Sequence, residues 1–573
     1  MKTLLRYLQK YYGRMGLGLL IKTAGTVIEL LIPYILTYVL REDEQKTMTQ
    51  IILWGGIMVL CSIAACVMNV IANRMASKVS RDFAEAMRKD LFAKTLRLSA
   101  AQTDRFTIPS LESRITTDTY HVHQFINMLQ RMGVRAPIIL AGGIGITLFM
   151  DAKLSLVMIA LIPIIFAVVI FIRMKGVPLY TKVQQATDGM VRVVREDIQG
   201  IRVIKALSKV EHEKTRYNSV NRTLSSEETR AGVTMGLVHP VVNVFMNMGS
   251  VTVIALGANY IAGGTSNPET IIAFIQYFTQ ISMSLMAVSR MFVMYSKASA
   301  SANRIEEVLL APEDIQVQSQ TQYPRKETDA HIVFDRVCFS YNKKRNDLEN
   351  ISFTLKKGDR LGIIGATGSG KSTLVKLLLR FYDTDCGNIY IDGQNIRTME
   401  KTDLYARFGT SLQQDFLYAE TIGENIKFGR PITDEQMQKA ARLAQAEDFI
   451  CNFEDGYNHK LSAHGTNISG GQKQRLLIAR ALAADPQILI LDDSSSALDY
   501  KTDAALRKAL AENLQDTTVV TVAQRVSSVK DCTQILVLEQ GAIIGMGTHE
   551  QLMESCPEYK EISDSQMGGD FDA

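Results

Sequence analysis

Long stretches without charged residues recur along the first half of this 573-residue chain. About 20 apolar residues are enough for a helix to cross a bilayer. The hydrophobic pattern therefore predicts a membrane domain of six transmembrane helices, followed by a half with shorter apolar runs. The predicted spans lie at Leu17–Leu40, 51–73, Pro137–Met150, 154–172, within 231–268, and at 271–289.

The charges between the predicted spans are unevenly distributed. Nine Lys and Arg residues lie in 74–114 and twelve in 173–230, whereas Ile261–Glu269 contains none. Because basic loops stay on the cytoplasmic side, we expect both long loops, the N-terminus and the second half to be cytoplasmic, in an inner or plasma membrane. Lys22 and Glu29 interrupt the first span, which indicates a retained helix and not a cleaved signal peptide.

Several polar side chains fall inside the predicted spans. Glu29 lies in the middle of the first span, where it either serves a substrate site or pairs with another residue across helices. Lys22 lies closer to the cytoplasmic end, and we expect it to extend to the membrane surface. Other residues either line an adaptable cavity or belong to ordinary helix packing. They are Asn243, Asn247, Gln276, Gln280, Met246, Met283 and Met286.

A glycine-rich segment in the second half carries the most specific chemistry. It follows a strand-like run, Arg360–Ile364, and precedes the helix-forming Leu374–Leu379. In G-x-x-x-x-G-K-[ST], backbone N–H groups surround phosphate oxygens, the Lys reaches the terminal phosphates and the Ser binds Mg²⁺. The sequence therefore predicts a nucleoside triphosphate site. Its residues are Gly365, Thr367, Gly368, Ser369, Gly370, Lys371, Ser372 and Thr373.

Two further segments point to the same phosphate chemistry. Gln487–Asp493 is an apolar run ended by two carboxylates, which is typical of a buried parallel strand. Asp492 would hold Mg²⁺ through water beside the glycine-rich phosphate-binding loop at 365–373, the P-loop. Ser469 precedes a helix-forming run as a good N-cap, and Gly470 and Gly471 leave that helix N-terminus open to phosphate.

These patterns predict a fold class and a domain order. An α-helical six-span transmembrane domain is followed by an α/β P-loop nucleotide-binding domain. The predicted boundaries are an amphipathic surface helix at 1–15, the membrane domain at 16–305, a polar, proline-containing linker at 306–330, and the nucleotide-binding domain at 331–573.

Composition excludes some functions. The net charge is +4, and no basic patch interleaved with aromatic residues predicts nucleic-acid binding. The seven cysteines have no metal-ligand spacing, and we expect reduced packing residues.

The ordered motifs of the second half resemble those of the ATP-binding cassette (ABC) family, and the first half resembles the six-helix membrane domain of its exporters. The resemblance implies a dimer in which each ATP lies between one chain's P-loop and the other chain's signature motif. It implies that Tyr341 stacks on adenine, that Gln413 contacts Mg²⁺ and water, and that Asp499 lies at the interface between cassettes. The signature motif that would bind the partner's ATP comprises Ser469, Gly470, Gly471 and Gln472.

Two loop segments also match the exporter pattern. Asp104–Phe106 with Ser113–Ile115, and Gly200–Lys205 followed by Glu211, resemble the loops that carry coupling helices. Their occurrence in both basic loops favours a coupling role over solvated helices.

The chain departs from the family at one nucleotide site. Efficient ATPases of the family have Glu directly after the Walker B Asp, but here Asp493 is one methylene shorter, and a displacement near 1 Å can cost about a hundredfold in rate. The switch position, usually His, is Gln524, which cannot become charged. The signature keeps all but one family residue, with Ile468 in place of Leu, whereas Ser462–Gly465 lacks the usual acidic residue.

This lopsided pattern resembles the degenerate-site subunit of heterodimeric, multidrug-type bacterial ABC exporters. The sequence thus predicts an ATP- and Mg²⁺-dependent half-transporter in membrane lipid, with a second, catalytically complete half as its partner. Asp493, Gln524 and Gln413 are its candidate catalytic residues, and Ser372, Gln413 and Asp492 its candidate Mg²⁺ site. A slow homodimeric exporter, a nucleotide-gated channel or regulator, and an importer on the exporter fold stay open as alternatives. The substrate class, whether hydrophobic or amphipathic small molecule, lipid or peptide, is not resolved by these residues.

Overall fold

The computed structural model describes residues 2–41, 47–263, 267–313, 315–413 and 416–567. They form two compact units, which we describe separately. The first comprises Met1–Leu96 and Thr107–Ala311, and the second comprises Arg97–Phe106 and Pro312–Ala573. The second unit therefore includes a short segment of the first basic loop.

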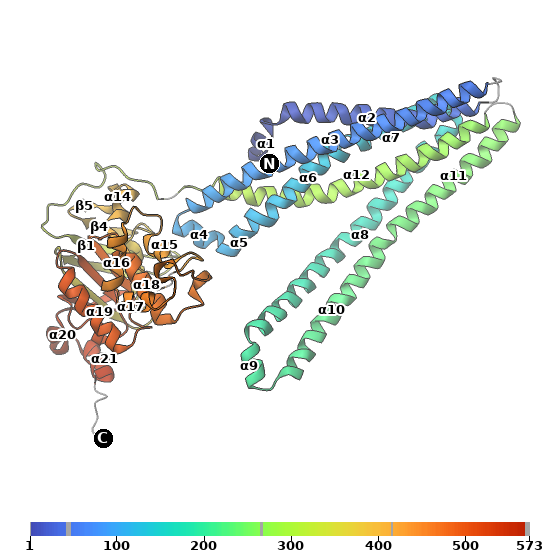
Figure 1. The fold of residues 1–573 in the computed structure, drawn as a ribbon. Coiled ribbons are helices and arrows are strands. Elements are labelled where there is room, and N and C mark those ends of the chain that lie inside the picture. Colours follow the sequence, from blue (N-terminus) through green and yellow to red (C-terminus); the bar gives the residue numbers. More distant parts are fainter. Residues whose placement is uncertain (1, 42–46, 264–266, 314, 414–415, 568–573) are drawn as a thin grey trace. The chain divides into compact units, whose positions relative to one another are not determined.

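The first unit is built from long helices (Figure 1). Six of the described segments are long and apolar enough to cross a membrane, which confirms the predicted number of spans. The helices are α1 (Lys2–Gln9), α2 (Tyr12–Leu40), α3 (Met48–Leu96), α5 (Ile108–Ser113), the π-helix η1 (Arg114–Asp118), α6 (Thr119–Met132), α7 (Arg135–Met150), α8 (Ala152–Gln199), α9 (Ile201–Ala206), α10 (Val210–Gly236), α11 (Val238–Ala262) and α12 (Pro268–Leu309).

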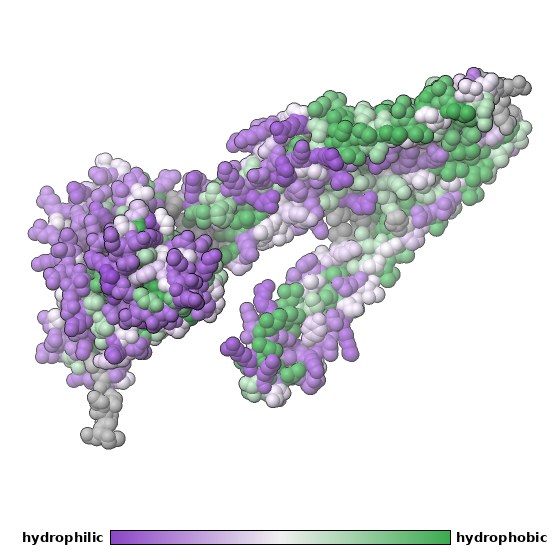
Figure 2. All heavy atoms as spheres, in the orientation of Figure 1, coloured by the Kyte–Doolittle hydropathy of each residue, from purple (hydrophilic) through white to green (hydrophobic). Residues whose placement is uncertain are grey.

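Hydrophobic residues cover the part of this unit where α2 approaches α3 and α11 approaches α12, whereas hydrophilic and hydrophobic residues are mixed near α9 (Figure 2). Inside the bundle, Leu30, Phe274 and Tyr277 belong to one buried cluster with residues of α7, α8 and α11. The Tyr277 hydroxyl donates a hydrogen bond of 2.7 Å to the Leu30 carbonyl, so its polar end is satisfied inside the apolar core.

Lys22 is buried, and the expectation that it extends to the membrane surface is wrong. Its Nζ donates hydrogen bonds of 2.7 Å to Asn69 Oδ1 and 3.2 Å to Asn73 Oδ1, and its side chain is only 5% exposed. Two amide oxygens one turn apart on α3 solvate the ammonium group, so it need not reach the headgroups.

The start of the predicted linker is helical. The chain turns polar from Ser301, yet α12 continues to Leu309, because Ala302, Ile305 and Val308 are buried at helical spacing. Ser301 itself donates a hydrogen bond to the buried Asp118 of η1.

The second unit contains two sheets and is the α/β domain that the sequence predicts. One sheet is antiparallel, in the order β2-β1-β4-β5, and the other has the order β10-β9-β3-β8-β7-β6, with only β10 antiparallel to its neighbour. The strands are β1 (Ile332–Phe339), β2 (Leu348–Leu355), β3 (Arg360–Gly365), β4 (Cys386–Ile391), β5 (Gln394–Asn395), β6 (Phe408–Ser411), β7 (Ile488–Asp492), β8 (Thr518–Val522), β9 (Gln534–Glu539) and β10 (Ala542–Gly547).

Helices surround these sheets, and one of them comes from the first basic loop. It is α4 (Ala100–Phe106), and the others are α13 (Lys371–Leu378), α14 (Lys401–Ala406), α15 (Ile422–Lys427), α16 (Asp434–Leu443), α17 (Glu447–Cys451), α18 (Gly470–Leu482), α19 (Tyr500–Asn513), α20 (His549–Ser555) and α21 (Pro557–Met567). The 3₁₀ turns are η2 (Ile396–Thr398), η3 (Gly456–Asn458), η4 (Ala463–Gly465) and η5 (Val526–Ser528).

Cys338 and Cys386 form a disulfide, so the expectation of reduced packing cysteines is wrong for this pair. They lie opposite each other on the antiparallel strands β1 and β4, with Cα atoms 5.0 Å apart. Strand pairing brings together two residues that are 48 positions apart in the chain, which cysteine spacing alone does not reveal.

Candidate nucleotide site

The carboxyl ends of three neighbouring parallel strands converge at the candidate site. β3 ends at Gly365 and leads into the glycine-rich loop, β7 ends at Asp492, and β8 ends two residues before Gln524. Ligands of open α/β sheets bind at this edge. A cavity of about 630 Å³ lies here, lined by the P-loop together with Gln413, Asp492, Asp493 and Gln524.

The P-loop geometry depends on Gly370. This residue is the N-cap of α13 and has φ of +103°, a conformation that side chains with a Cβ rarely adopt. A Cβ at this position would lie 2.6 Å from Leu348 Cδ2 and 3.1 Å from the Asp347 carbonyl oxygen. Glycine at this position therefore allows the P-loop to lie close to β2, with the N–H groups of the loop beside the cavity.

Lys371 occupies the mouth of this loop. Its Nζ donates hydrogen bonds of 2.8 Å to the carbonyl oxygens of Gly365 and Ala366. Burial lowers the pKa of Lys371, and the nearby carboxylates of Asp492 and Asp493 oppose that shift. When a triphosphate is bound, its oxygens would take the place of these two carbonyls as hydrogen-bond acceptors for Lys371.

The residues present fit a magnesium ion. Ser372 Oγ lies 3.4 Å from Asp492 Oδ1, and Gln413 lines the same cavity. Burial raises the pKa of Asp492, and the hydrogen bond from Ser372 opposes that rise. Among the residues that the structure describes, no three His, Cys, Asp or Glu side chains form a metal cluster. A nucleotide-bound Mg²⁺ needs none, because phosphate oxygens and water complete its octahedron.

The two departures from the family pattern contact each other. Gln524 Nε2 donates a hydrogen bond of 3.1 Å to Asp493 Oδ2. Burial raises the pKa of Asp493, with Lys371 and then Arg525 opposing the shift. The Asp493 carboxylate is thus held by a neutral amide, which can orient it but cannot become charged.

The signature segment is ordered as a helix start. Ser469 Oγ accepts a hydrogen bond from the Gln472 N–H, and Gln472 Oε1 accepts one from the Ser469 N–H, which forms a capping box. The prediction that Ser469 caps this helix is confirmed. Ser469 and Gly470 are exposed, and none of the signature residues lines the P-loop cavity of the same chain.

Tyr341 and Asp499 lie outside the same cavity. Tyr341 is 44% exposed and packs edge-on against Tyr382, with ring centroids 5.1 Å apart. Asp499 is the exposed N-cap of α19 and accepts hydrogen bonds from the N–H and the hydroxyl of Thr502, which lower its pKa. Both positions are available to a ligand or partner surface. Gln414 and Asp415, which follow Gln413, lie outside the described residues.

Sequence reasoning missed Asp347 and Tyr382. Asp347 Oδ2 accepts a hydrogen bond of 2.9 Å from the Tyr341 N–H, so it positions the aromatic residue. The Tyr382 hydroxyl donates a hydrogen bond to Asp104 of α4. Burial raises the pKa of Tyr382, and the bond to Asp104 adds to the rise. No local motif marks either residue: Asp347 contacts Tyr341 six positions earlier in the same loop, and Tyr382 contacts Asp104 from a distant segment.

We expect Tyr382→Phe to loosen α4. The substitution removes one hydrogen bond to a carboxylate, worth about 1 kcal/mol, so amide hydrogen exchange within 100–106 should accelerate roughly fivefold. Tyr405→Phe is the matched control, because the Tyr405 hydroxyl has no hydrogen-bond partner among the described residues. Equal acceleration in both variants would contradict a specific role for the Tyr382–Asp104 contact.

The membrane unit holds a second cavity, of about 670 Å³. Glu29, Gln280, Met283 and Met286 line it, and Glu29 also pairs with Arg135, with 2.6 Å between Oε1 and the guanidinium. The pairing interpretation of Glu29 is confirmed, and its role in a substrate site stays a prediction. The remaining polar or methionine candidates, which do not line this cavity, are Asn243, Asn247, Gln276 and Met246.

Comparison with known proteins agrees with this architecture. Residues 15–285 match the family model for the ABC transporter transmembrane region, and residues 348–496 match the ABC transporter model. The chain is 32% identical over 571 residues to the uncharacterized ABC transporter ATP-binding protein YfiB of Bacillus subtilis, covering 99% of each chain. It is 30% identical to the putative ABC transporter ATP-binding protein exp8 of Streptococcus pneumoniae, covering 99% of this chain and 97% of that one.

The chain belongs to the ABC transporter family and has the architecture of an exporter-type half-transporter. Its fold matches the structure of a bacterial Atm1-family ABC exporter with ATP bound, with a TM-score of 0.81 and 23% identity over 99% of both chains.

Proposed function

We propose that this chain exports a substrate across the cytoplasmic membrane as one half of a heterodimer, in which it carries the degenerate nucleotide site. Two observations support the proposal: Asp493 and Gln524 contact each other at the P-loop cavity, and the capping box at Ser469, outside that cavity, is intact. The capping box leaves Ser469 and Gly470 exposed at the start of α18, as contact with a partner's ATP requires.

In this proposal the two chains share two ATP sites. This chain's P-loop, Tyr341 and Ser372 hold one MgATP against the partner's signature, and Ser469–Gln472 close over the ATP on the partner's P-loop. Closure of the cassettes, with Asp499 at their interface, moves the coupling segments and opens the membrane cavity outward. Hydrolysis takes place mainly on the partner's P-loop and resets the transporter.

The test compares the ATPase activity of the purified chain with that of the co-expressed pair. We expect the chain alone to bind ATP and to hydrolyse it slowly. In the pair, Asp493→Asn should change turnover less than about twofold, because this carboxylate is already too short. The partner's catalytic Glu→Gln should lower turnover about a hundredfold or more, because a positioned base is removed.

A homodimer of this chain that hydrolyses ATP as fast as the pair would refute the heterodimer. Equal losses from the two carboxylate substitutions would instead show that both sites share the chemistry.

A further inference from the structure

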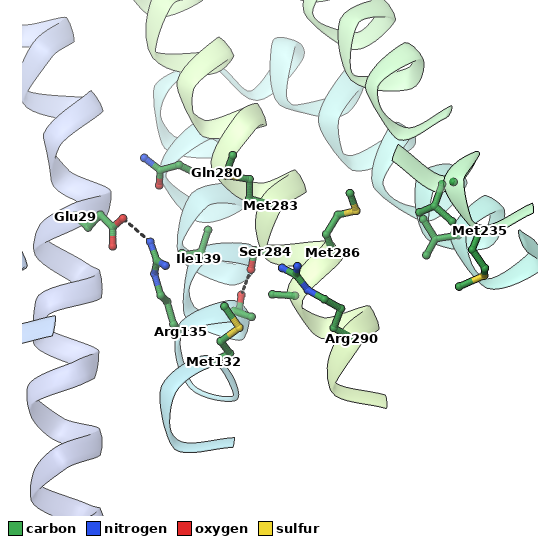
Figure 3. A pocket seen from close by; sticks show the side chains of 15 residues that line it. Glu29, Met132, Arg135, Ile139, Met235, Gln280, Met283, Ser284, Met286 and Arg290 are labelled. Atoms are coloured by element: carbon green, nitrogen blue, oxygen red, sulfur yellow. Dashed lines mark hydrogen bonds and ion pairs between the residues drawn. The ribbon is translucent and has the colours of Figure 1, made fainter. Parts of the chain in front are cut away.

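The membrane cavity is lined by residues of α2, α6, α7, α8, α10, α11 and α12. Its volume of about 670 Å³ lies in the range of sites that hold a drug-sized molecule. Figure 3 shows Gln280, Met283, Ser284, Met286 and Arg290 following one another along α12, opposite Ile139 and Arg135 of α7. Along α12 the cavity is therefore lined first by an amide (Gln280), then by mainly apolar side chains, and finally by a cation (Arg290).

Three of the described residues that line the cavity are charged. Glu29 and Arg135 neutralise each other through their ion pair. Arg290 is exposed, and it has no hydrogen bond or ion pair with any residue in the described part of the chain. The lining thus carries one uncompensated positive charge.

That charge lies close to the boundary of the membrane core. Arg290 is about 33 Å along α12 from Pro268 at a rise of 1.5 Å per residue, and the hydrocarbon core is about 30 Å thick. An arginine near that boundary avoids the full cost of burial, roughly 2.5–3.5 kcal/mol at the bilayer centre, but still requires an anion or water. A guanidinium binds carboxylate and phosphate oxygens through two parallel hydrogen bonds.

Other polar atoms on the wall also lack partners. Glu29 Oε2, Arg135 Nε and Gln280 Oε1 are buried without a hydrogen-bond partner among the described residues. The Ser284 hydroxyl, by contrast, is satisfied by donating 2.8 Å to the Ala136 carbonyl. These three unpaired atoms add to the polar character of the residues that line the cavity.

The rest of the lining is apolar and adaptable. Four methionines, Met132, Met235, Met283 and Met286, lie around it together with Ile139. Unbranched thioether side chains repack around irregular apolar shapes at low cost. This surface can bind an alkyl or aryl group, and it does not select for one particular shape of that group.

We propose that the cavity binds an amphipathic anion, with an apolar body against the methionines and one anionic head group on Arg290. The inference rests on the proposed export function, whose transported substrate it assigns to this class. The head group is a carboxylate, phosphate or sulfate, and an anionic lipid and a smaller amphiphile share this chemistry. Arg290 is a binding residue for the head group, and Glu29 limits the total positive charge by holding Arg135.

The experiment uses the full-length protein, with its partner chain, in phosphatidylcholine nanodiscs without nucleotide. The probes are a dansyl-labelled undecanoate, its methyl ester and the corresponding undecylamine, which share one apolar body. We expect the carboxylate to bind at least tenfold more tightly than the ester or the amine. Arg290→Gln should remove that preference, whereas Arg222→Gln, at an exposed position of α10, is the control for loss of a surface charge.

Glu29→Gln is an independent test, in which carboxylate affinity should rise and not fall. It frees Arg135 from its ion pair and should strengthen carboxylate binding severalfold, so the proposal can be tested even if Arg290→Gln fails to fold. Competition by lysophosphatidic acid at lower concentration than dodecanoate would assign the head group to a lipid phosphate. The reverse order would assign it to a carboxylate, and both orders support an anion site.

Two results would overturn the inference: amine binding as tight as carboxylate binding, or carboxylate affinity unchanged in both Arg290→Gln and Glu29→Gln. ATP-dependent uptake into inside-out vesicles separates this inference from the export function. Arg290-dependent carboxylate binding without ATP-driven uptake of any probe would refute export and leave the anion site standing. ATP-driven uptake of the amine alone would support export and refute the anion site.

Discussion

Ser469→Arg is expected to lower ATP hydrolysis by the assembled transporter about a hundredfold, although it leaves this chain's own P-loop unchanged. Ser469 caps α18; Ser469 and Gly470 are exposed, and Gly471 is partly exposed. A helix N-terminus stabilises phosphate only if the anion can approach, and loss of one such donor group at a reacting centre costs about 10²–10³ in rate. An arginine side chain at the cap blocks that approach.

The control for this substitution is Thr433→Arg. Thr433 caps α16 with the same kind of capping box, closed by Gln436, and it is also exposed. Loss of either cap costs about 1 kcal/mol of helix stability. Steady-state ATPase should therefore fall only in Ser469→Arg, if the lost phosphate contact and not the lost cap is responsible.

The same measurement on Lys371→Ala shows which P-loop serves the main site. In the proposed heterodimer this change weakens nucleotide only at the degenerate site, so turnover should fall less than in Ser469→Arg. A larger loss from Lys371→Ala would place the main catalytic site on this chain's P-loop and would refute the degenerate-subunit proposal.

Gly370→Ala is expected to weaken ATP binding by the chain about a hundredfold. An alanine at φ of +103° is strained by roughly 1–2 kcal/mol, and its Cβ would also lie 2.6 Å from Leu348 Cδ2. The loop must move to relieve this overlap, and the N–H groups that surround the phosphates move with it. Binding of a fluorescent ATP analogue to the full-length chain measures the loss.

Gly368→Ala separates the overlap from the strain. Gly368 also has a positive φ, +84°, but a Cβ there would meet no atom within 4 Å. We expect its loss of affinity to be at least several times smaller. Similar losses at the two glycines would mean that backbone strain alone, and not contact with β2, determines the loop geometry.

The parts of the molecule that could be predicted from sequence are those encoded within one continuous segment. An uncharged run of sufficient length specifies a span, so the number of spans is correct. The P-loop and the cap at Ser469 are likewise local, because residues a few positions apart make the hydrogen bonds. The contact between Asp493 and Gln524 joins two strands, but both positions were already marked by their departure from the family pattern.

The parts that could not be predicted depend on pairs far apart in the chain. Lys22 is buried because Asn69 and Asn73 lie beside it, and neither amide carries a signal that assigns it to a lysine on another helix. The disulfide between Cys338 and Cys386 follows from the register of β1 and β4. Arg290 gives no sign in the sequence that it lines a cavity, since an arginine at the end of a span is usually solvated at the membrane surface.

The assignment of α4 to the second unit has a practical consequence for dissecting the protein. The second compact unit is discontinuous in sequence, so a truncated chain that starts at Pro312 lacks α4 and leaves the Tyr382 hydroxyl without Asp104. Kinetics measured on such a fragment would describe an incomplete domain. Adding the 97–106 segment back as a separate peptide, or grafting it to the fragment, would restore the missing piece. By the same reasoning, a change in the length of the first basic loop is also a change to the cassette.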